Sequence, residues 1–261
     1  MRRTTLVVPC YNEAQRLNVA AFTRFAQDGA AHLILVNDGS RDETLGVLEG
    51  IRNAAPTCVR VVDLPRNGGK AEAVRQGMLE ALNDGAEFVG FWDADLATPF
   101  DALSGFVEQL EARPHLEVVM GSRVRLLGRT IERDAKRHYA GRAFATAVSL
   151  ALRLPVYDTQ CGAKLFRATE RLRQALARPF VSRWVFDVEL LARLGSTSTG
   201  YSPELLVNTV CENPLMEWRD VAGSKLRMID FAKSGLDLVR IHKAYVRRRG
   251  IQATRTRERS A

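Results

Sequence analysis

The sequence predicts an α/β protein whose central sheet is mostly parallel and is flanked by helices. Two observations lead to this fold class. Short apolar runs alternate with longer segments that carry apolar residues at helical spacing, and the connections between them are a few residues long. Such alternation is typical of strand–helix–strand units, which place helices on both faces of a parallel sheet. With 261 residues, the chain can form one large domain of this kind.

The first part of the chain, up to Met120, carries the clearest alternation. Strands are expected at residues 6–8, 33–36, 59–64, 88–92 and 117–120, where apolar residues are consecutive. Helices are expected at residues 70–82 and 100–110. Ser40 and Glu43 have the spacing of a capping box, so another helix should begin there and bury Leu45, Leu48 and Ile51.

The pattern of signals changes after Gly121. Residues 121–128 are basic and loop-like, and residues 137–154 carry the apolar stripe of a helix. A polar turn at 158–162 leads into a short strand at 163–166, and a helix is expected near 186–194. The run at 205–210 is interpreted as a late strand. Residues 226–245 are expected to form a long amphipathic helix.

The formal net charge of +8 is concentrated toward one end of the chain. From Arg240 onward there are eight basic residues and one acid, which suits an anionic membrane surface, nucleic acid, or a solvated tail. No apolar run reaches the roughly 20 residues that a membrane span needs, and no signal-like segment follows Met1. A cytosolic protein is therefore expected. The cysteines lack metal-binding spacing and are expected to be reduced thiols.

Polar clusters follow three of the expected strands, at residues 9–13, 37–40 and 93–95. Because ligands bind beyond the carboxyl ends of parallel strands, these clusters should gather along one edge of the sheet. The Gly-rich signatures of dinucleotide-binding and phosphate-loop proteins are absent from the sequence, as is the serine-hydrolase elbow. These three classes are therefore disfavoured.

Asp93 and Asp95 stand one residue apart, directly after the strand expected at 88–92. Two like charges at such a place need a divalent metal, an arginine cluster or solvent beside them. Mg²⁺ or Mn²⁺ takes one or two carboxylates together with substrate phosphates. Lys70, Arg219 and Lys225 could neutralise the remaining charge as a diphosphate leaves. The acid pair therefore predicts a site for a metal-bound diphosphate.

Several motifs, taken in order, resemble those of a known enzyme family. They are VPCYNE at 8–13, VNDGS at 36–40, NGGK at 67–70 and DAD at 93–95. Together they resemble the inverting glycosyltransferases of family 2, which have the GT-A fold. The later motifs are GSR at 121–123, DTQCGAKLF at 158–166, RWVFDVELL at 183–191 and GSKL at 223–226. They look like the dolichyl-phosphate β-glucosyltransferase branch and, less closely, the dolichyl-phosphate mannose synthases.

The resemblance implies that a sugar moves from a nucleotide donor, with inversion, to the phosphate of a polyprenyl lipid. The matching positions are Pro9, Tyr11, Glu13 and Asp38 for the nucleoside, Asp93 and Asp95 for the metal and diphosphate, Arg123 and Arg137 for the acceptor phosphate, and Arg219, Ser224 and Lys225 for a loop over the donor. Asp158, on the acceptor side, is a further catalytic candidate. Because the acceptor phosphate is already anionic near neutral pH, a strong general base is not required.

The sequence leaves alternatives open for the identity of the donor and of the acceptor. Ala97 stands where mannose synthases usually carry Gln, and Ala97-Thr98 fits the glucosyl branch, so UDP-glucose is the expected donor. GDP-mannose, and a non-lipid acceptor, are the alternatives. A nucleotidyltransferase would favour a Gly-rich loop after the first strand. A nucleic-acid-binding module would spread its charge over a face with interleaved aromatics, so no nucleic-acid partner is expected.

The organisation expected from the resemblance has two parts. Residues 1–225 would form the GT-A catalytic domain, and residues 226–261 a C-terminal amphipathic helix with a basic tail. The protein would be cytoplasmic and peripheral at the inner face of the membrane. It would be held there by contact with anionic lipids or with a membrane-protein partner.

Overall fold

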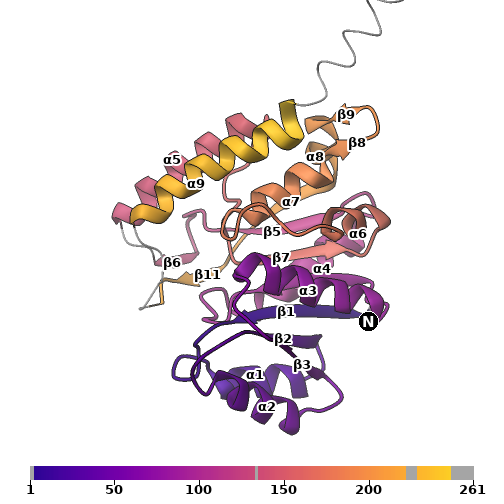
Figure 1. The fold of residues 1–261 in the computed structure, drawn as a ribbon, viewed down its shortest axis with the longest axis vertical. Coiled ribbons are helices and arrows are strands. Elements are labelled where there is room, and N and C mark those ends of the chain that lie inside the picture. Colours follow the sequence, from indigo (N-terminus) through magenta and orange to yellow (C-terminus); the bar gives the residue numbers. More distant parts are fainter. Residues whose placement is uncertain (1–2, 133–134, 222–227, 248–261) are drawn as a thin grey trace, which may run out of the picture.

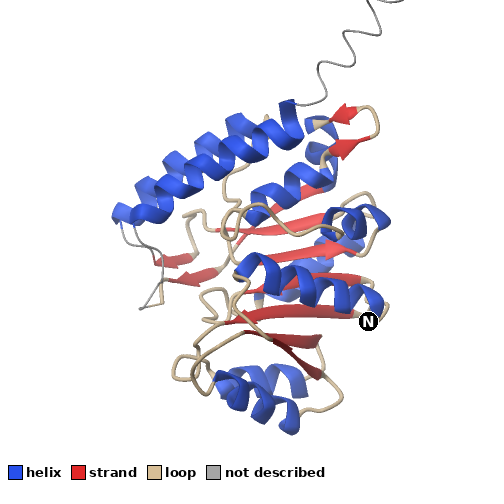
Figure 2. Cartoon of the chain, viewed as in Figure 1, coloured by secondary structure: helices blue, strands red, loops and turns tan. Residues whose placement is uncertain are grey.

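A central sheet of seven strands organises the fold (Figures 1 and 2). The computed structural model describes residues 3–132, 135–221 and 228–247. The strands of this sheet are β1 Thr4–Cys10, β2 His32–Asp38, β3 Val59–Leu64, β4 Phe88–Trp92, β5 Val118–Ser122, β7 Ala163–Arg167 and β10 Val210–Pro214. Their order is β10-β5-β7-β4-β1-β2-β3, and only β7 is antiparallel to its neighbours. The predicted class, a mostly parallel sheet flanked by helices, is confirmed.

Helices cover both faces of the sheet, as Figure 2 shows. They are α1 Val19–Gln27, α2 Thr44–Ala54, α3 Lys70–Asn83, α4 Ala102–Ala112, α5 Ala135–Leu152, α6 Glu170–Leu176, α7 Phe186–Leu194, α8 Pro203–Thr209 and α9 Met228–Ile241. Residues of α1, α2 and α4 share one hydrophobic core, and residues of α3, α6 and α7 share the other. In β1, Leu6 and Val8 face the first core while Val7 faces the second. Because both faces are buried, the strand is apolar throughout rather than alternating.

Two short strand pairs lie outside the central sheet. β6 Thr130–Glu132 pairs in parallel with β11 Glu217–Arg219, and β8 Ser196–Thr197 pairs with β9 Gly200–Tyr201 in antiparallel fashion. The first pair brings two segments that are far apart in the sequence to the same side of the sheet as the polar strand ends (Figure 1). It thereby places Trp218 beside the cavity described below.

Two local predictions are wrong. The run at 205–210 is not a strand, because the side chain of Ser202 caps helix α8 by accepting a hydrogen bond from the Leu205 N–H at 3.1 Å. The strand β10 begins only at Val210. The capping box at Ser40 is also wrong: α2 begins at Thr44, and the Ser40 hydroxyl accepts instead from the Asn12 N–H at 3.0 Å. Ser40 thus joins two loops at the sheet edge.

The C-terminal helix packs on the body of the protein. α9 lies beside α5 (Figure 1), and Leu238 and Ile241 are buried in the second core. A π-helical segment, His242–Arg247, follows it. The expected domain boundary between residues 225 and 226 lies outside the described residues. Among the helices that the structure describes, none combines the length and the apolar character needed to cross a membrane.

Candidate active site

A cavity of about 650 Å³ lies at the carboxyl ends of the parallel strands. All three predicted polar clusters reach it, through Tyr11 after β1, Asp38 at the end of β2, and Asp93 and Asp95 after β4. Arg123, which directly follows β5, lines it as well. Because the strand order runs from β2 through β1, β4 and β7 to β5, these groups follow one another along the edge. Asp38 marks one end and Arg123 approaches the other.

Asp38 holds the loop between β3 and α3. Its carboxylate is only 2% exposed and accepts hydrogen bonds from the Gly68 N–H at 2.7 Å and the Gly69 N–H at 2.9 Å. Burial raises the pKa of Asp38, and the two N–H groups offset part of that rise. Gly39 follows with φ of 59°, and a Cβ there would lie 2.5 Å from the Asn67 nitrogen. Only glycine therefore allows the two loops to approach so closely.

Asp38→Ala is expected to weaken binding of the nucleotide by roughly tenfold to a hundredfold, because the loop that lines this end of the cavity loses its charged hydrogen-bond acceptor. Turnover of the bound complex should change less. Calorimetric titration with UDP and with GDP measures the effect, and Asp28→Ala, on the exposed end of α1, is the matched control. Unchanged affinity for both nucleotides would show that Asp38 does not contribute to the nucleotide site.

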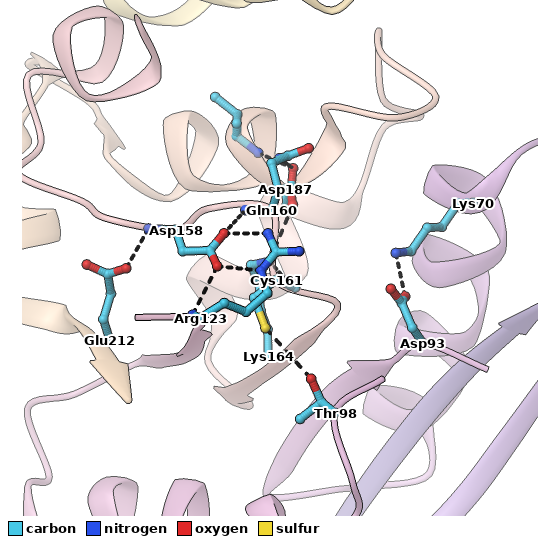
Figure 3. Close-up of polar contacts among 11 residues, drawn as sticks. Lys70, Asp93, Thr98, Arg123, Asp158, Gln160, Cys161, Lys164, Asp187 and Glu212 are labelled. Atoms are coloured by element: carbon cyan, nitrogen blue, oxygen red, sulfur yellow. Dashed lines mark hydrogen bonds and ion pairs between the residues drawn. The ribbon is translucent and has the colours of Figure 1, made fainter. Parts of the chain in front are cut away.

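The acid pair follows β4, the middle strand of the sheet. Figure 3 shows the Lys70 side chain pointing toward Asp93. Asp93 forms an ion pair with Lys70, the first residue of α3, and its N–H donates to the Gly162 carbonyl at 3.0 Å. Burial raises the pKa of Asp95, the charge of Asp93 raises it further, and the hydrogen bond from the Ala97 N–H opposes both. Burial lowers the pKa of Lys70, but the attraction and hydrogen bond of Asp93, together with the charges of Asp187 and Asp95, raise this pKa overall. The pair therefore carries negative charge that Lys70 does not fully neutralise.

The residues present fit a divalent metal that is shared with a substrate. No group of three or more His, Cys, Asp or Glu side chains in the described part of the chain could hold an ion by itself. Mg²⁺ and Mn²⁺ commonly use one or two carboxylates and complete their coordination with substrate phosphates. Asp93 and Asp95, with an excess of negative charge in an open cavity, provide such a set.

Arg123 forms an ion pair with the buried Asp158 toward the β5 end of the cavity (Figure 3). The guanidinium donates to both carboxylate oxygens, at 2.6 and 2.7 Å, and the Arg123 N–H adds a third bond at 3.1 Å. Burial alone would raise the pKa of Asp158, but the attraction and hydrogen bonds of Arg123 hold it at about 2. A carboxylate whose pKa lies so far below neutral pH has little affinity for a proton and is a poor general base. The three bonds hold Arg123 and Asp158 against each other.

Some of the remaining predicted residues line the cavity and others do not. Pro9, Tyr11 and Glu13 line the cavity, and Glu13 accepts a bond from Arg16 at 3.3 Å. Arg219 does not line it: its side chain is 62% exposed and pairs with Glu217. Arg137 belongs to α5, but its side chain is not described, and Ser224 and Lys225 lie outside the described residues.

Several residues that the sequence reasoning did not single out also belong to this cavity. Arg183 donates to the carbonyl of Gly68 at 3.0 Å and so supports the loop bound by Asp38. Asp187 is buried and pairs with Lys164 at 3.3 Å. Both Arg183 and Asp187 stand in the RWVFDVELL motif, which was the available signal. Arg142, on α5, carried no signal of its own in the sequence.

Comparison with known proteins places the chain in a family. Residues 5–172 match the model for glycosyl transferase family 2. The chain is 34% identical to the dolichyl-phosphate beta-glucosyltransferase of Drosophila melanogaster over 258 residues, which is 93% of this chain and 75% of that protein. It is 31% identical to the corresponding enzyme of Homo sapiens over 272 residues, 94% of this chain and 76% of that protein.

Solved structures agree in fold. The crystal structure of glucosyl-3-phosphoglycerate synthase from Mycobacterium tuberculosis in complex with UDP matches with a TM-score of 0.64 at 19% identity, over 93% of this chain and 80% of that one. A complex of the same enzyme with Mn²⁺, UDP-glucose and phosphoglyceric acid matches with a TM-score of 0.61. The chain therefore belongs to glycosyltransferase family 2, as a hexosyltransferase with the GT-A fold.

Proposed function

We propose that the protein transfers glucose from UDP-glucose to a polyprenyl phosphate of the dolichyl type, at the cytoplasmic face of a membrane. One observation carries the proposal. A single cavity joins the acid pair to a buried arginine–carboxylate pair on its far side, in a chain similar over 93% of its length to a dolichyl-phosphate beta-glucosyltransferase. The UDP-glucose and Mn²⁺ bound by the structural neighbour support the choice of donor and metal.

The proposed roles follow the order of groups along the sheet edge. Pro9, Tyr11, Glu13 and Asp38 surround the nucleoside, and Arg183 supports the loop at that end. Asp93 and Asp95 would hold Mg²⁺ or Mn²⁺, which when bound neutralises charge on the donor diphosphate. Lys70 adds a fixed positive charge at the same place. Arg219, Ser224 and Lys225 stay candidates for a loop over the donor, and Arg123, Arg137 and Asp158 for the acceptor side.

The transfer needs little acid–base chemistry from the protein. An oxygen of the acceptor phosphate attacks the anomeric carbon, the bond to the donor diphosphate breaks, and its electron pair leaves with the diphosphate. Because the attacking oxygen already carries charge, no proton has to be removed. The chain contributes orientation of the two substrates and stabilisation of the leaving group, which are terms that preorganised charges supply well.

A donor and acceptor panel tests the proposal. The full-length protein is incubated with UDP-glucose or GDP-mannose and with a short polyprenyl phosphate, the matching polyprenol or 3-phosphoglycerate, and products are identified by mass spectrometry. We expect glucosyl polyprenyl phosphate from UDP-glucose and no product from the alcohol. Transfer from GDP-mannose instead would support the mannosyl alternative. Transfer only to 3-phosphoglycerate would support a non-lipid acceptor and reject the proposed one.

Membrane residence is proposed to depend on the basic tail. Residues 248–261, which lie outside the described residues, contain five arginines and one glutamate. Each basic residue near an anionic leaflet contributes about 1 kcal/mol, and salt screens that attraction. Truncation after Arg247 should therefore abolish most sedimentation with anionic vesicles at low salt, with neutral vesicles as the control. Equal sedimentation of full-length and truncated protein would favour a membrane-protein partner.

A further inference from the structure

The cationic side chains that line the cavity differ in their partners. Arg16 pairs with Glu13, Lys70 with Asp93 and Arg123 with Asp158. Arg183 donates to Asn67 and Gly68 and is attracted to the nearby Asp38. Arg142 stands apart, because within the described part of the chain the recorded contacts of its guanidinium are with Tyr157 and include no carboxylate. A half-buried cation of this kind suits an anionic ligand.

Arg142 is held in place from several directions. Its guanidinium lies over the Tyr157 ring, 3.7 Å from the centroid, and Nη1 donates to the Tyr157 carbonyl at 2.8 Å. The Tyr157 and Asp158 N–H groups in turn donate to the two carboxylate oxygens of Glu212, at 2.8 and 2.7 Å. Figure 3 shows Glu212 reaching the Asp158 backbone from β10. The support is therefore anchored to the central sheet.

This arrangement leaves most N–H donors of the Arg142 guanidinium available for a ligand. An arginine has five N–H donors, and the bond to the Tyr157 carbonyl uses one of them. By contrast, the guanidinium of Arg123 binds both oxygens of Asp158. Arg142 thus retains the donors that a bidentate bond to a phosphate requires, and its charge is not paired with a carboxylate of the described residues, whereas the Arg123 guanidinium already uses two donors on the carboxylate of Asp158.

The position of Arg142 separates it from the donor diphosphate. Asp93 and Asp95 follow β4, whereas the Glu212 that supports Arg142 belongs to β10, three places along the sheet. At roughly 4.8 Å per strand, the two supporting strands are about 14 Å apart. An anion bound at Arg142 would therefore be supported from β10, whereas an anion at the acid pair would be supported from β4.

We propose that Arg142, supported by Tyr157 and Glu212, forms the binding subsite for the phosphate monoester of the acceptor. This inference rests on the proposed function for the identity of the acceptor. Arg123 and Glu212 are then positioning residues: Arg123 fixes Asp158, and Glu212 fixes the Tyr157–Asp158 backbone on which Arg142 lies. The subsite recognises the phosphate group itself and does not require a particular lipid chain.

The primary test compares wild-type protein with Arg142→Ala and Arg142→Lys. We expect Arg142→Ala to raise the KM for a short polyprenyl phosphate by roughly tenfold to a hundredfold, while UDP affinity measured by calorimetry stays within twofold. Arg142→Lys should fall between, because it retains the charge without the stacked, forked geometry. Arg24→Ala, on exposed α1, is the matched control. An unchanged acceptor KM, or a loss of UDP affinity, would overturn the assignment.

Two further measurements keep this test separate from that of the proposed function. Glu212→Gln should raise the acceptor KM with little change in kcat. Thermal unfolding of the Arg142 and Glu212 variants reports whether a substitution simply destabilises the protein. Calorimetry with the short polyprenyl phosphate, the matching polyprenol and inorganic phosphate tests binding without turnover. Binding of both phosphates but not the alcohol, weakened in Arg142→Lys and lost in Arg142→Ala, supports the subsite even if no sugar is transferred. Equal binding of the polyprenol would reject it.

Discussion

Asp95→Asn should lower kcat by about 10²- to 10³-fold while leaving the fold intact, because it removes one of the carboxylates that would hold the divalent metal, and the charge of that metal stabilises the departing diphosphate. Asp95 combines burial with a neighbouring like charge, and both raise its pKa. The amide has nearly the same shape but cannot supply that negative charge to a divalent ion. Single-turnover and steady-state measurements with UDP-glucose and a short polyprenyl phosphate quantify the loss.

The control for this prediction is Asp101→Asn, which removes an exposed carboxylate next to α4 and should leave activity unchanged. Excess chelator should abolish wild-type activity, and added Mn²⁺ or Mg²⁺ should restore it. Thermal unfolding of Asp95→Asn should match wild type, since the carboxylate has one recorded hydrogen bond, from the Ala97 N–H. Full activity in excess chelator would contradict a metal role for the acid pair.

Glu189→Ala should reduce the free energy of unfolding by about 3–5 kcal/mol, which is the usual cost of removing one partner from a buried ion pair. Glu189 is 0% exposed and lies on α7. Its carboxylate accepts from Arg193 Nη2 at 2.6 Å, from the Val181 N–H at 2.8 Å and from the Tyr245 hydroxyl at 3.0 Å. The substitution leaves the Arg193 cation without its carboxylate partner and the Val181 and Ser182 N–H groups without their acceptor.

Urea unfolding of the full-length protein measures this loss, and Glu108→Ala, on the exposed side of α4, is the control. Tyr245→Phe should cost about 1 kcal/mol, because the hydroxyl that accepts from Arg193 Nε and donates a hydrogen bond to Glu189 is removed. In a double-mutant cycle the two changes should be less than additive, since they share that bond. A Glu189→Ala protein as stable as wild type would show that the network contributes little net stability.

The same network holds the Val181 backbone near Arg183, which lines the cavity. Glu189→Ala should therefore also weaken UDP binding.

Much of the fold follows from local signals. The strands up to Met120 and the helices α3 and α7 are encoded by short-range periodicity, so they are predictable from neighbouring residues alone. The helix at 203–209 is not encoded by periodicity, because its short apolar run has no clear period, and its local signals are those of the cap instead. There the capping hydroxyl of Ser202 and the proline at the first helical position favour a helical turn. The antiparallel direction of β7 is likewise invisible locally, since side chains alternate identically in both directions.

The candidate site divides in the same way. The sequence by itself determined that carboxylates follow buried strands, and the rule for parallel sheets then placed Asp38, Asp93 and Asp95 at one edge. Only the tertiary structure decided which of the arginines and lysines at the cavity are paired with a carboxylate. Arg123 meets Asp158 across 35 positions of the chain, and Glu212 meets Tyr157 across 55. Whether an arginine keeps its donors free for a ligand depends on such distant partners, because charges interact through space and no local pattern records which of them meet.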